Sequence, residues 1–328
     1  MELLYMLPNR KKVPASIGIF GATGHIGGPM AAWLRRHAPD VRVRLITSNP
    51  ASVDALRNRH PGCEVVVGDY YDRSSLTKAV ADMEGLFVIA TTWTREEEAM
   101  TNLVAAIREA DCLTHMIRVV GELPNANLRR VPPELHEFGL GIELQHPIAR
   151  RIIDDSDLPN TYFNIGASFM DNLLRPGMFV PEKRKLQWME HRVPYIDPRE
   201  IGEAAARVLL DDDHRHLYQF HTLNNGQDYL FFRDVAAIMS DVLQTHIAFD
   251  ADEENFLAVL RRGVEAGTMP AMLPDYLLHY HGYEEENQVG WALNDFLERT
   301  LGRKPTTMRA WLMEYKPFFL KQLNAAVS

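Results

Sequence analysis

The sequence predicts an α/β fold in which a doubly wound parallel sheet carries helices on both faces. Short apolar segments that fit buried strands alternate with segments of helical periodicity over the first half of the chain. The first apolar segment, residues 16–20, ends in glycines, and Ile26, Met30 and Leu34 then recur at helical spacing. Strands that alternate with helices in this way pair in parallel through right-handed crossovers.

The glycines between this strand and this helix indicate a dinucleotide site. Their spacing is Gly21-x-x-Gly24-x-x-Gly27 rather than G-x-G-x-x-G. Backbone without side chains can approach a diphosphate closely, and the helix that follows directs free N–H groups and its positive end at the anion. We expect a Rossmann-type phosphate site here, and the alternative is a glycine turn without a ligand. The predicted residues are Gly21, Thr23, Gly24, His25, Ile26 and Gly27.

The remaining elements follow in order along the chain. Strands are predicted at 41–47, 63–67, 85–90, 115–120, 160–165 and 217–221. Helices are predicted at 74–83, 96–110, 147–155 and 199–210, and helical patterns dominate from residue 232 onward. Between residues 121 and 144 the pattern lapses, and a loop of that length is usually functional or mobile.

The chain is expected to divide into two parts of unequal size after an N-terminal extension, residues 1–13. Residues 14–165 and about 188–225 form the predicted Rossmann domain. Residues 166–187, which are irregular with helical hints, and about 226–328 form a smaller, mostly helical C-terminal substrate lobe. Ligands of doubly wound sheets bind outside the carboxyl ends of the strands, so we expect the ligand cleft between the two parts.

Composition excludes several classes of protein. The 328 residues carry a formal charge of −9, so no basic surface for nucleic acid or an anionic membrane is expected. No apolar run approaches the ~18 residues of a membrane span, and two cysteines cannot build a disulfide framework. We expect a cytoplasmic protein without a metal, in which the histidine pairs 214/216 and 279/281 are solvated and residues 284–286 form an exposed acidic face. A homodimer is left open.

The side chains that follow the second, third and fourth strands are expected to hold the rest of a dinucleotide. An acidic residue after the second strand selects NAD and an arginine accommodates NADP, but this chain has Ser48 and Asn49 there, so both cofactors remain open. We expect Asp69 to accept a hydrogen bond from the adenine amino group with Tyr70 against the ring; the alternative is that Asp69 only opens a turn. The predicted cofactor site also includes Ala90, Thr91 and Thr92.

Several stretches, in a specific order, resemble the NmrA-like family of atypical short-chain dehydrogenases, which includes quinone reductases, triphenylmethane reductases, isoflavone-reductase relatives and redox-sensing regulators. The resemblance covers about residues 15–318. It rests on the glycine turn, on Gly68-Asp69-Tyr70, and on a run from His146 to Asn172 that contains Ser156-Asp157-Leu158-Pro159-Asn160-Thr161 and Phe169-Met170-Asp171-Asn172. Val193-Pro194-Tyr195-Ile196-Asp197-Pro198-Arg199-Glu200-Ile201 and Leu301-Gly302-Arg303-Lys304-Pro305-Thr306 complete it. The resemblance implies binding of NADP or NAD.

The chain departs from this family at chemically important positions. Many members carry Arg at the place of Ser48, and Asn164 stands where the family commonly has Arg. The Ser and Tyr of short-chain dehydrogenases are replaced by Val120-Gly121 and Ile142, and His146 takes the place of the Lys. His146 is therefore the predicted catalytic residue, as a contact to the nicotinamide ribose or as a proton donor, because an imidazole titrates near neutrality. Its alternatives as donors are Tyr162, Glu122 and His136.

We therefore expect an NAD(P)-dependent oxidoreductase that transfers a hydride to a planar, hydrophobic, conjugated small molecule such as a quinone. Such acceptors delocalise the added electrons, so they need little acid catalysis. Trp93, Phe169 and Met170 are predicted to line the substrate cleft, although each is more often core. The alternatives are a non-catalytic protein that senses NAD(P) and a pathway monooxygenase or isomerase on the same scaffold.

Overall fold

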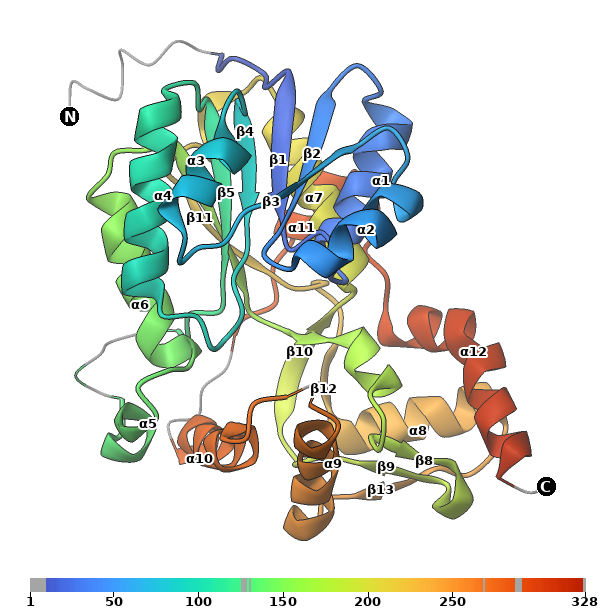
Figure 1. Ribbon diagram of the computed structural model, residues 1–328. Helices are drawn as coiled ribbons and strands as arrows, with labels where there is room; N and C mark the ends of the chain where they lie inside the picture. The colour runs from blue at the N-terminus through green and yellow to red at the C-terminus, as the bar shows by residue number, and fades with distance from the viewer. Residues whose placement is uncertain (1–9, 125–128, 130, 268, 287–290, 327–328) are drawn as a thin grey trace.

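The structure, a computed structural model, describes residues 10–124, 129, 131–267, 269–286 and 291–326 (Figure 1). The fold centres on one seven-stranded parallel sheet in the order β11-β6-β5-β4-β1-β2-β3, which confirms the predicted doubly wound α/β class. Its strands are β1 (Ser16–Phe20), β2 (Arg42–Thr47), β3 (Glu64–Val67), β4 (Gly85–Val88), β5 (His115–Val120), β6 (Asn160–Ile165) and β11 (Phe220–Leu223).

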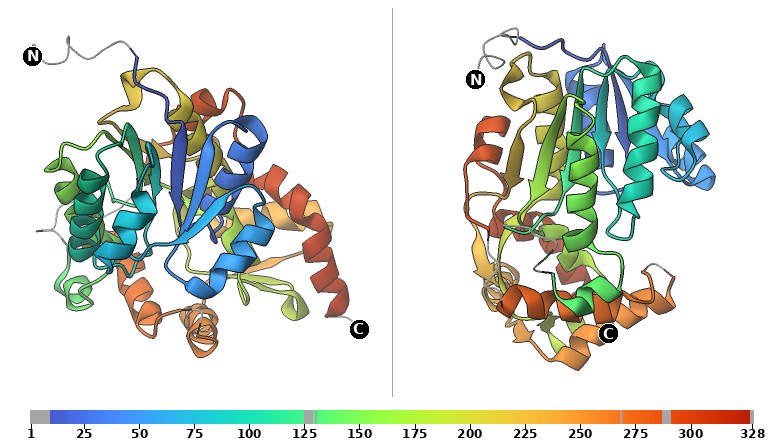
Figure 2. Two further views of the ribbon diagram at one scale, coloured as in Figure 1. Left: turned by 45° about the horizontal axis from the view of Figure 1, so that its top comes forward. Right: turned by 90° about the vertical axis from the view of Figure 1, so that its left-hand side faces the viewer.

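Helices cover both faces of this sheet (Figure 2). One face packs against α1 (Gly27–His37), α2 (Val53–Arg59), α7 (Pro198–Leu210) and α11 (Phe296–Leu301). The other face packs against α3 (Arg73–Val80), α4 (Glu96–Ala110) and α6 (Ile142–Asp154). Every residue of β1 and β5 is buried, as expected for central strands covered on both sides.

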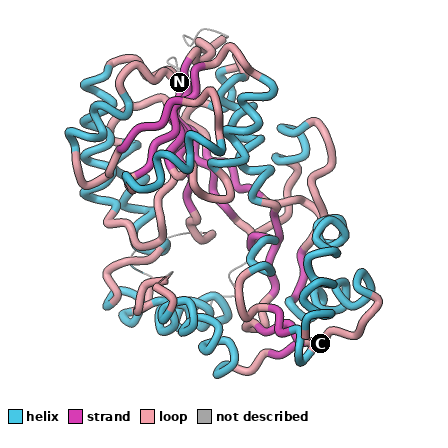
Figure 3. Tube along the Cα trace, turned by 45° about the vertical axis from the view of Figure 1, so that its right-hand side comes forward, coloured by secondary structure: helices cyan, strands magenta, loops and turns pink. Residues whose placement is uncertain are grey.

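A second lobe lies beyond the carboxyl ends of the strands (Figures 1 and 3). Its helices are α5 (Pro133–Glu137), α8 (Phe232–Leu243), α9 (Glu253–Glu265), α10 (Leu273–Glu286) and α12 (Met308–Ala325). It also contains two three-stranded sheets that the sequence did not predict. These are β12 (Tyr229–Phe231), β10 (Arg192–Ile196) and β7 (Ser168–Phe169) in one sheet, and β13 (Ala248–Asp250), β9 (Lys185–Gln187) and β8 (Phe179–Val180) in the other.

Several predicted boundaries were wrong, two of them for clear local reasons. The last strand of the large sheet begins at Phe220 rather than at residue 217, because Tyr218 has a left-handed backbone (φ 59°) that a strand cannot contain. Helix α6 begins at Ile142 rather than at Pro147, after Gly141 with φ 114°. The helix continues through Pro147, which the sequence reading had placed at its first turn. Within the described residues, no helix is long and apolar enough to cross a membrane.

Helices α1 and α7 approach each other at Gly202. A Cβ on this residue would lie 2.6 Å from the carbonyl oxygen of Ile26 and 3.0 Å from the amide nitrogen of Met30. We expect Gly202→Ala to lower the free energy of unfolding by about 1–3 kcal/mol, because backbone rather than a flexible side chain opposes the new methyl group. Urea denaturation measures this difference.

Gly282 in α10 is the matched control. It is exposed, and a Cβ there would meet no atom within 4 Å. Gly282→Ala should leave stability unchanged or raise it by up to about 1 kcal/mol, because alanine favours the helix. Equal effects of the two substitutions would contradict the close approach of α1 and α7.

Candidate functional site

The glycine turn between β1 and α1 is shaped to hold a diphosphate. Gly21 adopts φ 69°, and its carbonyl oxygen accepts a hydrogen bond of 3.0 Å from the amide of Gly24. A Cβ on Gly27 would lie 2.6 Å from that same oxygen, so only glycine fits there. Helix α1 has no side-chain N-cap and no acidic residue in its first turn, which leaves its positive end free for an anion. These residues fit the diphosphate of a dinucleotide.

A cavity of about 360 Å³ continues from this turn along the carboxyl ends of β1 to β4. It brings together residues that the sequence analysis predicted from separate strands. These are Gly21, Thr23, Ser48, Asp69, Tyr70, Ala90, Thr91 and Trp93. Asn49 does not line this cavity; its side chain accepts a hydrogen bond of 3.0 Å from the amide of Ala51 and caps the turn after β2.

Asp69 and Tyr70 also have structural partners in this cavity. The Asp69 carboxylate accepts a 3.0 Å hydrogen bond from the amide of Tyr71, as in the alternative turn interpretation. The Tyr70 hydroxyl donates to the carbonyl oxygen of Ile89 at 2.9 Å, and its ring stacks on Phe20 with centroids 5.0 Å apart. Burial raises the pKa of Tyr70, so this phenol stays neutral. The side chain of Asp69 lines the cavity with one carboxylate oxygen engaged in the turn.

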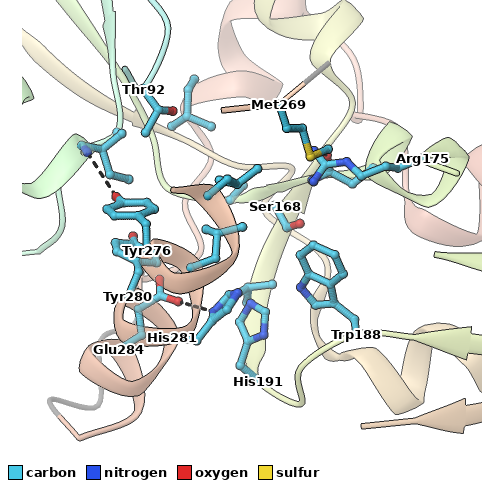
Figure 4. A pocket seen from close by; sticks show the side chains of 18 of the residues that line it. Thr92, Ser168, Arg175, Trp188, His191, Met269, Tyr276, Tyr280, His281 and Glu284 are labelled. Carbon is cyan, nitrogen blue, oxygen red and sulfur yellow. Dashed lines mark hydrogen bonds and ion pairs between the residues drawn. The ribbon is translucent and has the colours of Figure 1, made fainter. Parts of the chain in front are cut away.

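A second cavity, of about 470 Å³, lies between the sheet and the second lobe (Figure 4). Trp93 lines both cavities, so the two adjoin. The predicted cofactor residue Thr92 lies in the second one. Its walls are largely aromatic, and its polar groups come from both lobes. The chief lining residues are Trp93, Ile142, Arg175, Trp188, His191, Tyr276, Tyr280, His281, Glu284 and Trp291.

His146 is buried beside Gly121 at the edge of this cavity, and 7% of it is exposed. Its Nδ1 accepts a 2.7 Å hydrogen bond from the amide of Gly121, which places the ring proton on Nε2. Burial, and then the nearby charge of Arg118, lowers the pKa of His146 to about 3. The ring is therefore neutral at pH 7. It can donate a hydrogen bond from Nε2, but it is not a reservoir of a readily released proton.

The other predicted substrate residues do not line the second cavity. Met170 is fully buried in the core of the second lobe. Phe169 packs edge-on against His25, with centroids 4.9 Å apart. The Nδ1 atom of His25 lies 2.7 Å from the carboxylate of Asp171, so the glycine turn is tied to the second lobe at this point.

The alternative proton donors lie apart from both cavities as far as the described residues define their linings. The Tyr162 hydroxyl is 2.8 Å from a carboxylate oxygen of Asp154. Glu122 forms an ion pair of 2.9 Å with Arg150. His136 lies on α5.

The sequence analysis missed three polar residues of the second cavity. His281 and Glu284 were expected in solvent, but each side chain is only 10% exposed and the two are 3.1 Å apart. His191, between β9 and β10, lies beside them. One atom of each of the three residues that could ligate a metal lies within 4.8 Å of the other two such atoms. Burial, and then His281, lowers the pKa of His191 to about 4. The available signal was the His281-x-x-Glu284 spacing, which places both side chains on one face of a helix.

The expectation for the other histidine pair was partly wrong as well. His216 is 7% exposed, and its Nδ1 lies 3.2 Å from Nε2 of His221. Burial is the main cause of a lowered pKa for His216. This pair lies near α11, away from both cavities described above, and belongs to the packing of the sheet edge.

Comparison with known proteins gives consistent relatives. A model of the NmrA-like family matches residues 14–312. The (4-alkanoyl-5-oxo-2,5-dihydrofuran-3-yl)methyl phosphate reductase of Streptomyces griseus subsp. griseus is 25% identical over 304 residues, which cover 92% of this chain and 98% of that protein.

Solved structures share the fold. The triphenylmethane reductase of Citrobacter sp., complexed with NADP(H), has a TM-score of 0.73 at 21% identity and covers 92% of this chain and 99% of its own. The NADPH-dependent quinone oxidoreductase of Escherichia coli, complexed with NADPH, has a TM-score of 0.72 at 21% identity, with 91% and 99% coverage.

The buried neutral state of His146 predicts a pH dependence of stability. Its pKa is lowered from 6.5 to about 3 in the folded protein, so below pH 6.5 the unfolded chain binds a proton that the folded chain does not. The contribution is complete above pH 6.5 and is lost as the pH falls toward 3. Between pH 6.5 and pH 5, the free energy of unfolding of the wild type should fall by about 2 kcal/mol more than that of His146→Gln. Urea denaturation across this range measures both slopes, and identical slopes would contradict a neutral buried His146.

Proposed function

The chain belongs to the NmrA-like family, and we propose that it is an NAD(P)-dependent reductase of a planar, conjugated, hydrophobic acceptor such as a quinone. The observation that carries this proposal is the pair of adjoining cavities that share Trp93. One begins at a glycine turn that fits a diphosphate, and the other is walled by aromatic side chains. A dinucleotide that lies along the first would present its nicotinamide where the second begins.

The first cavity supports dinucleotide binding by main-chain contacts. Gly21, Gly24 and Gly27 leave the backbone accessible, and the uncapped first turn of α1 favours the diphosphate. Ala90, Thr91 and Thr92 follow β4 and line the path from one cavity to the other. When bound, a reduced nicotinamide supplies the hydride. The reductases of Citrobacter sp. and Escherichia coli with this fold are complexed with NADP(H) and NADPH.

The second cavity supports a flat, apolar acceptor. Trp93 packs edge-on against Tyr276 with ring centroids 5.4 Å apart, and Tyr276 is only 2% exposed. Together with Trp188 and Tyr280 they form walls that exclude water and favour stacking. His146, neutral and fixed by Gly121, contributes a hydrogen bond from Nε2 rather than a charge. An aromatic cavity of this size next to the dinucleotide site favours a reductase over a protein that only senses the dinucleotide.

Turnover tests this proposal directly. Purified protein is incubated with NADH or NADPH and a panel of benzoquinones and naphthoquinones, and the loss of reduced nicotinamide absorbance is followed. We expect dinucleotide-dependent quinone reduction by the wild type. Dinucleotide binding without turnover of any acceptor would contradict the reductase and favour the sensing alternative.

Gly27→Ala tests the diphosphate site. The added Cβ would lie 2.6 Å from the carbonyl oxygen of Gly21 and would force the turn to move. We expect at least about a tenfold weaker dinucleotide affinity, the equivalent of one lost charge-assisted hydrogen bond. Isothermal titration calorimetry measures it, with circular dichroism as a check of folding and Gly282→Ala as the control. Unchanged affinity would show that the diphosphate does not bind at this turn.

Ser48→Arg tests the adenosine end of the first cavity, where none of the described lining residues is Arg or Lys. A guanidinium at the end of β2 would pair with a 2′-phosphate. We expect the affinity ratio of NADPH to NADH to rise about tenfold. The control is Ala266→Arg, which adds the same charge at an exposed position of the second lobe. Equal effects of both variants would show that the change comes from the added charge of the protein as a whole and not from a contact with the 2′-phosphate.

A further inference from the structure

We propose that His281 is the proton donor to the substrate oxygen in the second cavity, and that Glu284 is the positioning residue that orients it. This inference rests on the proposed reductase function and names the residue that completes its chemistry. It also narrows the substrate class to neutral conjugated carbonyl compounds, quinones foremost, whose oxygen must gain a proton when the ring is reduced.

His281 and Glu284 form a pair on α10. Nδ1 of His281 lies 3.1 Å from a carboxylate oxygen of Glu284, one helical turn further along. A carboxylate only accepts hydrogen bonds, so Nδ1 carries the proton in this contact. Both side chains are 10% exposed, so the pair is fixed inside the protein rather than on its surface. A histidine held at one nitrogen by a carboxylate presents its other nitrogen in a fixed direction.

The other nitrogen of His281, Nε2, is buried and is left without a hydrogen-bond partner within the described part of the chain. Buried polar atoms in proteins are nearly always hydrogen-bonded, so an unpaired one in a cavity wall calls for a ligand. Figure 4 shows His281 and His191 side by side at one end of the cavity, next to Trp188. A substrate oxygen in the cavity would supply the missing partner.

The imidazole ring of His281 packs among other rings. Its neighbours are the rings of His191, Phe256, Tyr280 and Trp188, with centroids between 4.7 and 6.3 Å away. They restrict water and fix the orientation of the imidazole. A ring nitrogen of His191 lies within 4.8 Å of His281 and Glu284. The pKa of His191 is lowered to about 4, however, so this neighbouring histidine is neutral at pH 7.

The positions at which short-chain dehydrogenases carry their Ser and Tyr offer no acid. By the family resemblance, Val120-Gly121 and Ile142 stand at these positions. His146 uses Nδ1 to accept the Gly121 amide and stays neutral. Of His146, His191 and His281, only His281 has a hydrogen bond to a carboxylate among the described residues.

The reaction balances with this donor. A hydride brings two electrons and one hydrogen to the quinone, and the carbonyl oxygen becomes negatively charged. Nε2 of protonated His281 transfers its proton to that oxygen, which gives the hydroquinone, and the neutral imidazole takes a proton from solvent before the next turnover. A cationic triphenylmethane dye differs, because its positive central carbon accepts the hydride and the neutral product needs no proton.

This difference gives the test. Reduction of a naphthoquinone and of malachite green is measured with the same protein and dinucleotide. We expect His281→Gln to lower the ratio of quinone to dye kcat about a hundredfold, the usual size of general-acid catalysis. Glu284→Gln should lower the same ratio in the same direction by a smaller factor. A role in folding alone would lower both rates together and leave the ratio unchanged.

The matched control is His279→Gln. His279 lies two residues before His281 on the same helix but is exposed, so the ratio should equal that of the wild type. If the wild type reduces both acceptors and His281→Gln keeps the ratio, the proton-donor inference is overturned while the reductase stands. If the wild type reduces neither acceptor, the proposed function itself fails.

A second readout needs neither dinucleotide nor turnover. Trp93 and Trp188 line the cavity, so quenching of tryptophan fluorescence reports hydroquinone binding. We expect His281→Phe to weaken this binding about tenfold through the lost hydrogen bond, and His279→Phe to leave it unchanged. An unchanged Kd for His281→Phe would overturn the contact. Zinc retained in stoichiometric amount by the wild type through dialysis, and lost in His281→Gln, would assign the cluster to metal binding and overturn it too.

Discussion

The N-terminus of α1 is the constraint on which the rest of the structure depends. On one side, the carbonyl oxygen of Gly21 leaves no room for a Cβ on Gly27. On the other side, the backbone of the same helix leaves no room for a Cβ on Gly202 of α7. Helix α1 is therefore held against both the turn and its neighbour through main-chain contacts. This rigid placement keeps the positive end of the helix directed at the first cavity, where an anion would bind.

The second lobe contacts this turn at His25. His25 in the turn contacts both Asp171 and Phe169, which follow the last residues of β6. The chain then forms the two small sheets, and α10 closes the second cavity from the far side. The cavity is a product of long-range packing: Trp93 follows β4, Trp188 follows β9, and Tyr276 lies on α10. These three side chains line one cavity because both lobes are fixed to the same strand ends.

Local patterns were sufficient for the large sheet and for much of the first cavity. Strands buried on both faces have near-continuous apolar sequences, and the glycine turn follows from sterics that operate within a few residues. Predicted element boundaries were wrong where the backbone adopts a conformation that the residue type does not indicate. Tyr218 is an example, because no sequence pattern indicates its left-handed backbone. The small sheets were not predicted, because all of their strands except β10 have only two or three residues and carry almost no periodicity. The polar end of the second cavity could not be predicted, because the burial of His281 and Glu284 is decided by elements distant in sequence.

The histidines of this protein differ in their surroundings and in their hydrogen-bond partners. His146 is buried without a carboxylate partner in the described part of the chain and near the positive charge of Arg118, so its pKa is lowered and the ring stays neutral. A positive charge is thereby removed from the junction of the two cavities. His281, at the other end of the aromatic cavity, has the carboxylate that His146 lacks. The histidine with a carboxylate partner therefore belongs to the second lobe, which also supplies most of the aromatic wall of the second cavity.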